Sequence, residues 1–157
     1  MSVAFTPENK AAFDALLTRY PTKAAALLPT LWLVQRQEGW ISEEAMEYVA
    51  GLLDLAPVKV YSVVSFYTMY YTRPMGRHVI QICRNLSCSL LGARELIRHV
   101  EERTGIAVGE TTADGRFSLL TVECLGACGN APMMQVNDDY HVDLSPARVD
   151  EILASMA

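Results

Sequence analysis

Hydrophobic residues in the first half of the chain recur three or four positions apart, as on one face of a helix. Typical helix starts precede three of the runs, at Thr6-Pro7, Ser42 and Pro57, and Gly39 marks one end. Pro29 either kinks the second helix or starts it afresh. We therefore expect a small bundle of four short helices that bury one shared face. The predicted inward residues are Phe13, Leu16, Leu17, Tyr20, Leu27, Leu28, Leu31, Val34, Met46, Val49, Ala50, Leu53, Val60, Val63 and Val64.

The pattern changes near Pro74-Met75-Gly76, which we take as a domain boundary between residues 1–75 and 76–157. Beyond it, two β-branched runs at 78–83 and 117–122 predict buried strands. A helix capped by Ser89 and ended by Gly105 is expected between them.

The remaining segment predicts a hairpin and a closing helix. Residues 133–136 and 140–142 flank Asn137-Asp138-Asp139, a typical turn sequence. Ser145-Pro146 then caps and starts the last helix. The whole pattern predicts an α+β protein, in which a small N-terminal helical bundle precedes an α/β domain with the element order of a thioredoxin-like fold.

Composition and charge narrow the possible partners. The chain of 157 residues is 51% hydrophobic, enough to form a folded core. Its 13 basic and 18 acidic residues give a net charge of -5, and no basic run breaks this balance, so nucleic acid is not an expected partner. The longest apolar stretches, 24–34 and 58–71, are shorter than the ~18–20 apolar residues of a membrane span.

The first residues suggest where the protein is found. Residues 1–8 lack the basic segment and apolar core of a signal peptide. We therefore expect a cytoplasmic protein, whose thiols stay reduced. The four cysteines of such a protein are better candidates for metal or redox chemistry than for disulfides.

The four cysteines form two pairs, each following a predicted strand. Cys83 and Cys88 have the spacing C-x4-C, and Cys124 and Cys128 the spacing C-x3-C, with residues 89–123 between the pairs. If the two strands are neighbours, both loops open at the same edge of the sheet and the four sulfurs converge. Such a thiolate set suits tetrahedral zinc or an iron–sulfur cluster.

The spacing leaves both metal centres possible, with free thiols as a third case. Structural zinc favours tighter knuckles, whereas the small residues Gly126, Ala127, Gly129 and Ala131 would let backbone approach the sulfide of a cluster. No C-x-x-C is present, which disfavours dithiol exchange of the thioredoxin type.

The residues around the second pair resemble a known family. Residues 123–132, read together with the spacing of both cysteine pairs, are similar to the thioredoxin-like [2Fe–2S] ferredoxin family, and within it to the E-type subunits of NADH:quinone oxidoreductase, respiratory complex I. The likeness extends over most of the chain, through segments 37–42, 65–69, 109–115 and 135–138.

This resemblance implies an electron-transfer subunit with one [2Fe–2S] cluster, in which Cys83 and Cys88 bind one iron and Cys124 and Cys128 the other. It implies a partner flavoprotein that carries FMN and the NADH site, within the peripheral arm of complex I on the cytoplasmic side of the membrane. No catalytic residue is expected in this chain, which contains neither of the common glycine-rich phosphate motifs.

Two alternatives stay open at this point. Equivalent subunits with the same chemistry occur in NAD-reducing hydrogenases and NAD-dependent formate dehydrogenases. From a different class, a zinc-stabilised interaction module would use the same four cysteines without redox activity.

Overall fold

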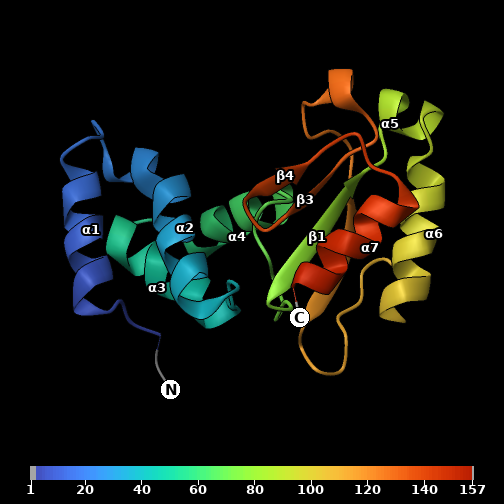
Figure 1. Cartoon of the computed structure of the whole chain (residues 1–157). Coiled ribbons are helices and arrows are strands. Elements are labelled where there is room, and N and C mark those ends of the chain that lie inside the picture. Colours follow the sequence, from blue (N-terminus) through green and yellow to red (C-terminus); the bar gives the residue numbers. More distant parts are fainter. Residues whose placement is uncertain (1–2, 157) are drawn as a thin grey trace. The chain divides into compact units, whose positions relative to one another are not determined.

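A computed structural model describes residues 3–156 and divides the chain between Pro74 and Met75. The first part, here called the helical unit, contains four α-helices; the second, the sheet unit, contains a four-stranded sheet and three α-helices (Figure 1). The described residues thus have the predicted α+β fold, with the helices preceding the sheet. None of the helices in this range combines the length and apolar character that crossing a membrane requires.

The helical unit begins its helices largely where the capping residues predict. Thr6 accepts a hydrogen bond from the Asn9 backbone N–H (3.2 Å), and Ser42 accepts one from that of Ala45 (3.1 Å). Pro29 lies in the first turn of its helix, where a missing N–H removes no helical hydrogen bond, so the helix continues through it. The four helices are α1 (Pro7–Leu17), α2 (Leu27–Glu38), α3 (Glu43–Leu53) and α4 (Pro57–Phe66).

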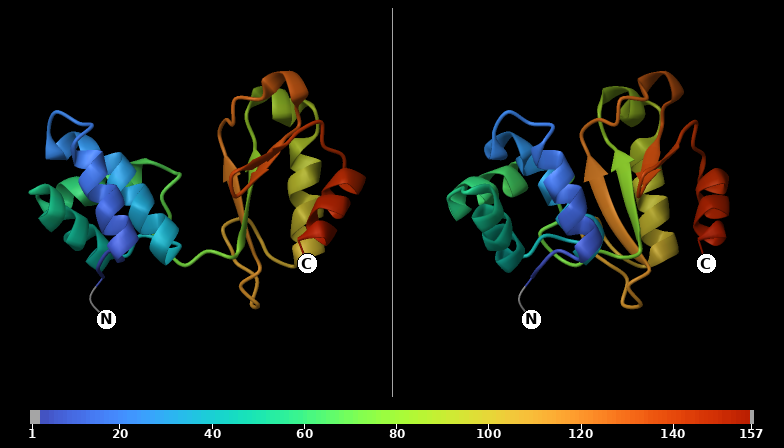
Figure 2. Two further views of the ribbon diagram at one scale, coloured as in Figure 1. Left: turned by 60° about the vertical axis from the view of Figure 1, so that its left-hand side comes forward. Right: turned by 90° about the vertical axis from the view of Figure 1, so that its left-hand side faces the viewer.

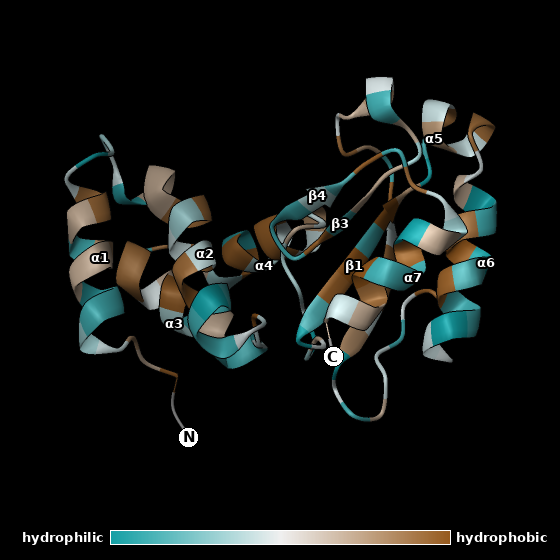
Figure 3. Cartoon of the chain, in the orientation of Figure 1, coloured by the Kyte–Doolittle hydropathy of each residue, from teal (hydrophilic) through white to brown (hydrophobic). Residues whose placement is uncertain are grey.

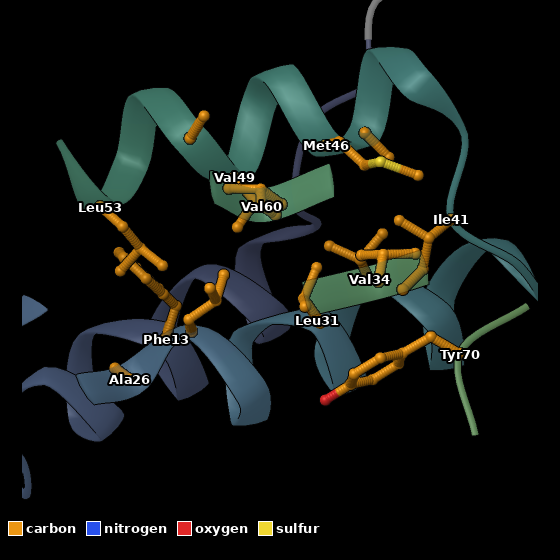
Figure 4. Packing of buried hydrophobic residues seen from close by; sticks show 14 residues of the cluster. Phe13, Ala26, Leu31, Val34, Ile41, Met46, Val49, Leu53, Val60 and Tyr70 are labelled. Atoms are coloured by element: carbon orange, nitrogen blue, oxygen red, sulfur yellow. The ribbon is translucent and has the colours of Figure 1, made fainter. Parts of the chain in front are cut away.

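The core of the helical unit is formed by apolar side chains from all four helices (Figure 4). Of the predicted inward residues, Leu16, Leu17, Tyr20, Leu28 and Val63 are only partly buried. Tyr20 lies beyond the last residue of α1, because that helix ends sooner than its hydrophobic spacing suggested. The largest fully buried side chains of this unit are Leu31, Val34, Ile41, Val49, Leu53, Val60 and Val64.

The sheet unit contains one parallel pair of strands, β1 and β2, with β2 at the edge of the sheet. β1 pairs with β2 in register from His78–Phe117 to Cys83–Val122, and on its other side β1 pairs antiparallel with β3. The order of the sheet is β2-β1-β3-β4. Its elements are β1 (His78–Cys83), α5 (Leu86–Leu90), α6 (Ala93–Thr104), β2 (Phe117–Val122), β3 (Met134–Val136), β4 (Asp139–His141) and α7 (Pro146–Ser155).

Both long helices of the sheet unit lie against one face of the sheet (Figure 2). Figure 3 shows β1 as apolar over most of its length, whereas α6 alternates apolar and polar residues. Apolar side chains of α6 and α7 form one core with those of the strands, as expected for amphipathic helices on a sheet. The strand and helix residues of this core include Ile80, Ile82, Leu96, Val100, Leu119, Met134, Val149 and Ile152.

The structure corrects the predicted start of the helix after β1. Ser89 does not cap it but lies inside α5, a short helix that the sequence pattern did not predict. Asn85 caps α5 by accepting a hydrogen bond from the Leu86 N–H (2.7 Å). The longer helix α6 begins only at Ala93, after Gly92 with φ +100°.

The predicted hairpin is present, with a tighter turn than expected. Residue Asp139 belongs to β4, so the turn consists of Asn137 and Asp138 alone. Asn137 has φ +53°, a conformation that asparagine adopts more readily than most residues.

Candidate metal centre

Parallel pairing of β1 with β2 brings the two cysteine segments to one end of the sheet. Cys83 is the last residue of β1, and its register partner Val122 is the last residue of β2. One residue further on, the Arg84 N–H donates to the Val122 carbonyl (2.9 Å). The chain therefore enters the first cysteine loop (residues 83–88) and the second cysteine loop (residues 124–128) at the same edge.

The first cysteine pair is buried. Cys83 is 3% exposed and Cys88, on α5, is 2% exposed. Both pack with Ala93 and Met133, and the Cys83 N–H donates to the Met133 carbonyl (3.3 Å). The side chains of this pair are thus held by the sheet and by the start of α6, away from solvent.

The second pair lies in an exposed loop. Cys124 and Cys128 are both exposed and, like the first pair, are free thiols. Gly126 has φ +79°, and its N–H donates to the Cys124 Sγ (3.4 Å). This arrangement directs a backbone N–H toward sulfur. In metal centres bound by thiolates, such donors offset the negative charge on sulfur.

Burial raises the pKa of the Cys88 thiol above its ordinary value. A hydrogen bond with Cys83 raises it further, and the nearby Cys83 and Cys128 thiols act in the same direction. The two loops therefore bring at least three of the four predicted ligands within electrostatic reach of one another. A metal centre would supply positive charge that favours the thiolate form in such surroundings.

Contacts from β4 and the residues after it hold the second cysteine loop. The Tyr140 hydroxyl donates to the Leu125 carbonyl (2.8 Å), inside the loop. Just beyond the loop, the Asn130 side chain donates to the Asp143 carboxylate (2.9 Å), and the Asp143 N–H donates to the Asn130 carbonyl (2.9 Å). The exposed loop is thus fixed at its middle and at its end.

The four thiols come as two pairs, a donor set that suits a two-iron cluster. Within residues 3–156, no three His, Cys, Asp or Glu side chains are arranged to hold one metal ion. A two-iron cluster needs only two protein thiolates at each iron, and the chain offers its thiols as one buried and one exposed pair.

Sequence reasoning did not predict the ion pair between Arg84 and Glu123. Their side chains meet across the two loops, although the residues are 39 positions apart. Neither residue type nor spacing signals such a contact. The Tyr140 hydrogen bond to Leu125 is equally non-local and was also missed.

Replacing Gly126 by valine is expected to lower the iron content of the protein. An added Cβ would meet nothing within 4 Å of the chain, so the strain comes from φ +79°, which β-branched residues avoid. Such a conformation costs about 1–3 kcal/mol. Iron content after anaerobic purification measures the effect, and Gly126→Asn, which tolerates positive φ, is the matched control. Equal iron in Gly126→Val and wild type would contradict a requirement for this conformation.

A small α+β domain with four thiols at one sheet edge is typical of proteins that bind a soft metal centre through thiolates. The chain belongs to the thioredoxin-like [2Fe–2S] ferredoxin family, whose model matches residues 13–157. This match confirms the resemblance seen in the cysteine segments.

Two relatives share most of their length with the chain. It is 46% identical over 142 residues to the E-type NADH-quinone oxidoreductase subunit numbered 2 in Rhizobium meliloti (strain 1021), covering 90% of this chain and 84% of the relative. It is 40% identical over 153 residues to the E-type NADH-quinone oxidoreductase subunit of Rickettsia bellii (strain RML369-C), covering 96% and 92%.

Among solved structures, NAD+-reducing [NiFe]-hydrogenase in the H2-reduced state has a similar fold. The TM-score is 0.73 at 24% identity, over 83% of this chain and 22% of the hydrogenase chain. This likeness concerns the fold alone.

Proposed function

We propose that this chain is an electron-transfer subunit of an NADH:quinone oxidoreductase, respiratory complex I, and carries one [2Fe–2S] cluster. The observation that carries the proposal is the meeting of two cysteine loops at the end of β1 and β2, in a chain of this family. The two E-type relatives, which align with nearly the whole chain, support the choice of complex.

In this proposal the ligands are divided by loop. Cys83 and Cys88 bind one iron and Cys124 and Cys128 the other. When bound, the cluster supplies a site that accepts and releases one electron at a time. The chain itself buries the first pair against Met133 and directs the Gly126 N–H toward Cys124. Its residues therefore hold the group, exclude water from one side and offset charge on sulfur, and none acts as a catalytic acid or base.

The proposed partner is a flavoprotein subunit that binds FMN and NADH and exchanges single electrons with the cluster. The chain lacks both common glycine-rich phosphate motifs, which agrees with nucleotide binding by another subunit. We place the assembly on the cytoplasmic side of the membrane, in the peripheral arm of the complex.

Electron paramagnetic resonance of the anaerobically purified chain tests the cofactor. After reduction with dithionite, we expect the signal of a one-electron-reduced [2Fe–2S] cluster, with two irons and two sulfides per chain. Zinc has no such signal and no redox change. A colourless protein with stoichiometric zinc and no signal would favour the zinc-stabilised module and contradict the proposal.

Isolation of the native assembly tests the choice of complex. A tagged chain is expected to copurify with an FMN-containing subunit that oxidises NADH, and with further subunits of a quinone reductase. An associated nickel–iron or molybdenum subunit would instead assign the chain to a hydrogenase or a formate dehydrogenase, and would overturn the complex I assignment.

A further inference from the structure

An ion pair joins the two cysteine loops at the point where they leave the sheet. The Arg84 Nε and terminal nitrogen donate to Glu123 Oε1, at 2.9 and 2.5 Å. Arg84 directly follows Cys83, and Glu123 directly precedes Cys124. In sequence, a positive charge is therefore adjacent to one predicted ligand of the first loop, and a negative charge is adjacent to one of the second.

Backbone contacts fix the same junction independently of the ion pair. The Arg84 N–H donates to the Val122 carbonyl (2.9 Å), and the Cys83 thiol lies 3.7 Å from the Glu123 carbonyl. Because the strands and these contacts already align the loops, the ion pair is not needed to bring the cysteines together.

The exposure of the pair also argues against a role in stability. The side chains of Arg84 and Glu123 are 57% and 71% exposed. Exposed ion pairs of this kind contribute little to the free energy of unfolding. A charge beside a redox centre has a more direct effect, because reduction adds one negative charge to the centre and every nearby charge favours one of the two oxidation states.

We propose that Arg84 and Glu123 are a charge-balanced pair whose two charges shift the reduction potential of the centre held by the two cysteine loops in opposite directions. This inference rests on the proposed function, since it requires a redox-active cluster. The Arg84 guanidinium stabilises the reduced, more negative cluster and raises the potential. The Glu123 carboxylate lowers the potential, and in the intact pair the two effects largely cancel.

Potentiometric titration of the full-length protein, followed by the resonance signal of the reduced cluster, tests the proposal. Arg84→Gln is expected to lower the ratio of reduced to oxidised cluster at least about threefold at a fixed potential, or about 28 mV at ~59 mV per tenfold. Glu123→Gln is expected to raise it by a similar factor. The double variant should return to within a factor of about two of wild type.

Arg103→Gln is the matched control for the loss of one positive charge. Arg103 is 57% exposed, like Arg84, and forms its own ion pair with Asp150 (2.8 Å). It lies near the far end of α6, ~15 Å along the helix from Ala93, which packs beside the first cysteine pair. Its replacement should leave the potential unchanged within the error of the titration.

The possible outcomes separate the inference from its alternatives. Opposite shifts in the two single variants, with full iron content, support a charge-balanced pair. Shifts of the same sign, or equal loss of iron in both, would indicate a purely structural tie and overturn the inference. A wild-type protein without a [2Fe–2S] signal would refute the proposed function itself, whereas a normal wild-type signal with unmoved variant potentials would refute only this inference.

Discussion

A protein in which Cys88 is replaced by alanine is expected to contain almost no cluster, while its helical unit stays folded. In the proposed centre each iron has two protein thiolates, so the variant leaves one iron with Cys83 alone. The helical unit contains no cysteine and has its own core, so its helices do not depend on the metal. Iron and sulfide content measures the first effect, and the fluorescence of Trp32 and Trp40, both in the helical unit, measures the second.

Burial of Cys88 complicates the interpretation of this variant, and a second variant removes the difficulty. Cys88→Ala deletes a buried sulfur and leaves a small cavity beside Met133. Cys124 is exposed, so Cys124→Ala costs no core packing, and its loss of iron would report on ligation without the effect of a cavity. Met133→Leu is the packing control, because it alters the same apolar cluster with a side chain of similar size and keeps every thiol. Wild-type iron in both cysteine variants would contradict the proposed ligand set.

Local sequence signals predicted most helices and strands. Thr6, Ser42 and Ser145 each cap the helix that they were expected to start, through a side-chain oxygen that accepts a backbone hydrogen bond. The prediction that Ser89 caps a helix was wrong, because serine is common both at helix caps and in short turns. In addition, the five-residue helix α5 is too short to produce a hydrophobic period. The correctly predicted helix starts depend on residues only three or four positions apart in sequence.

The candidate site depends on contacts that no local pattern encodes. The cysteine spacing indicated a metal centre. The loops converge only because β1 and β2 are adjacent and parallel, and the sequence alone did not establish this pairing. Cys83 is buried partly by Met133, which is distant from it in sequence, whereas Cys124 lies in an exposed loop. The contact between Arg84 and Glu123 arises in the same way, from strand register.

Gly76 illustrates a second requirement that only the structure makes visible. The sequence marked it as part of a boundary between domains, yet it is buried just before β1. A Cβ added there would lie 2.6 Å from the Phe117 carbonyl carbon and 2.9 Å from the Ser118 nitrogen, both backbone atoms at the start of β2. The Gly76 N–H also donates to the Ser118 hydroxyl (2.7 Å), which fixes this close approach. This position therefore has no room for a Cβ, because the backbone of a strand cannot move aside as a flexible side chain can.

Replacement of Gly76 by alanine is accordingly expected to destabilise the sheet unit by at least about 1–3 kcal/mol, the usual cost of an added methyl group in a filled interior. Hydrogen exchange is the suitable measurement, since it resolves the two units and a single unfolding transition is not assured in a two-unit chain. Amides of β1 and β2 should exchange about 5- to 150-fold faster, which is the same free energy expressed as a ratio.

Gly51→Ala is the control: Gly51 lies in α3 with nothing within 4 Å of an added Cβ, so the same substitution should leave exchange unchanged or slow it through higher helix propensity. Equal protection of β1 and β2 in Gly76→Ala and wild type would mean that β2 shifts at little cost, and that the close approach at Gly76 is not needed to stabilise the pairing of β1 with β2.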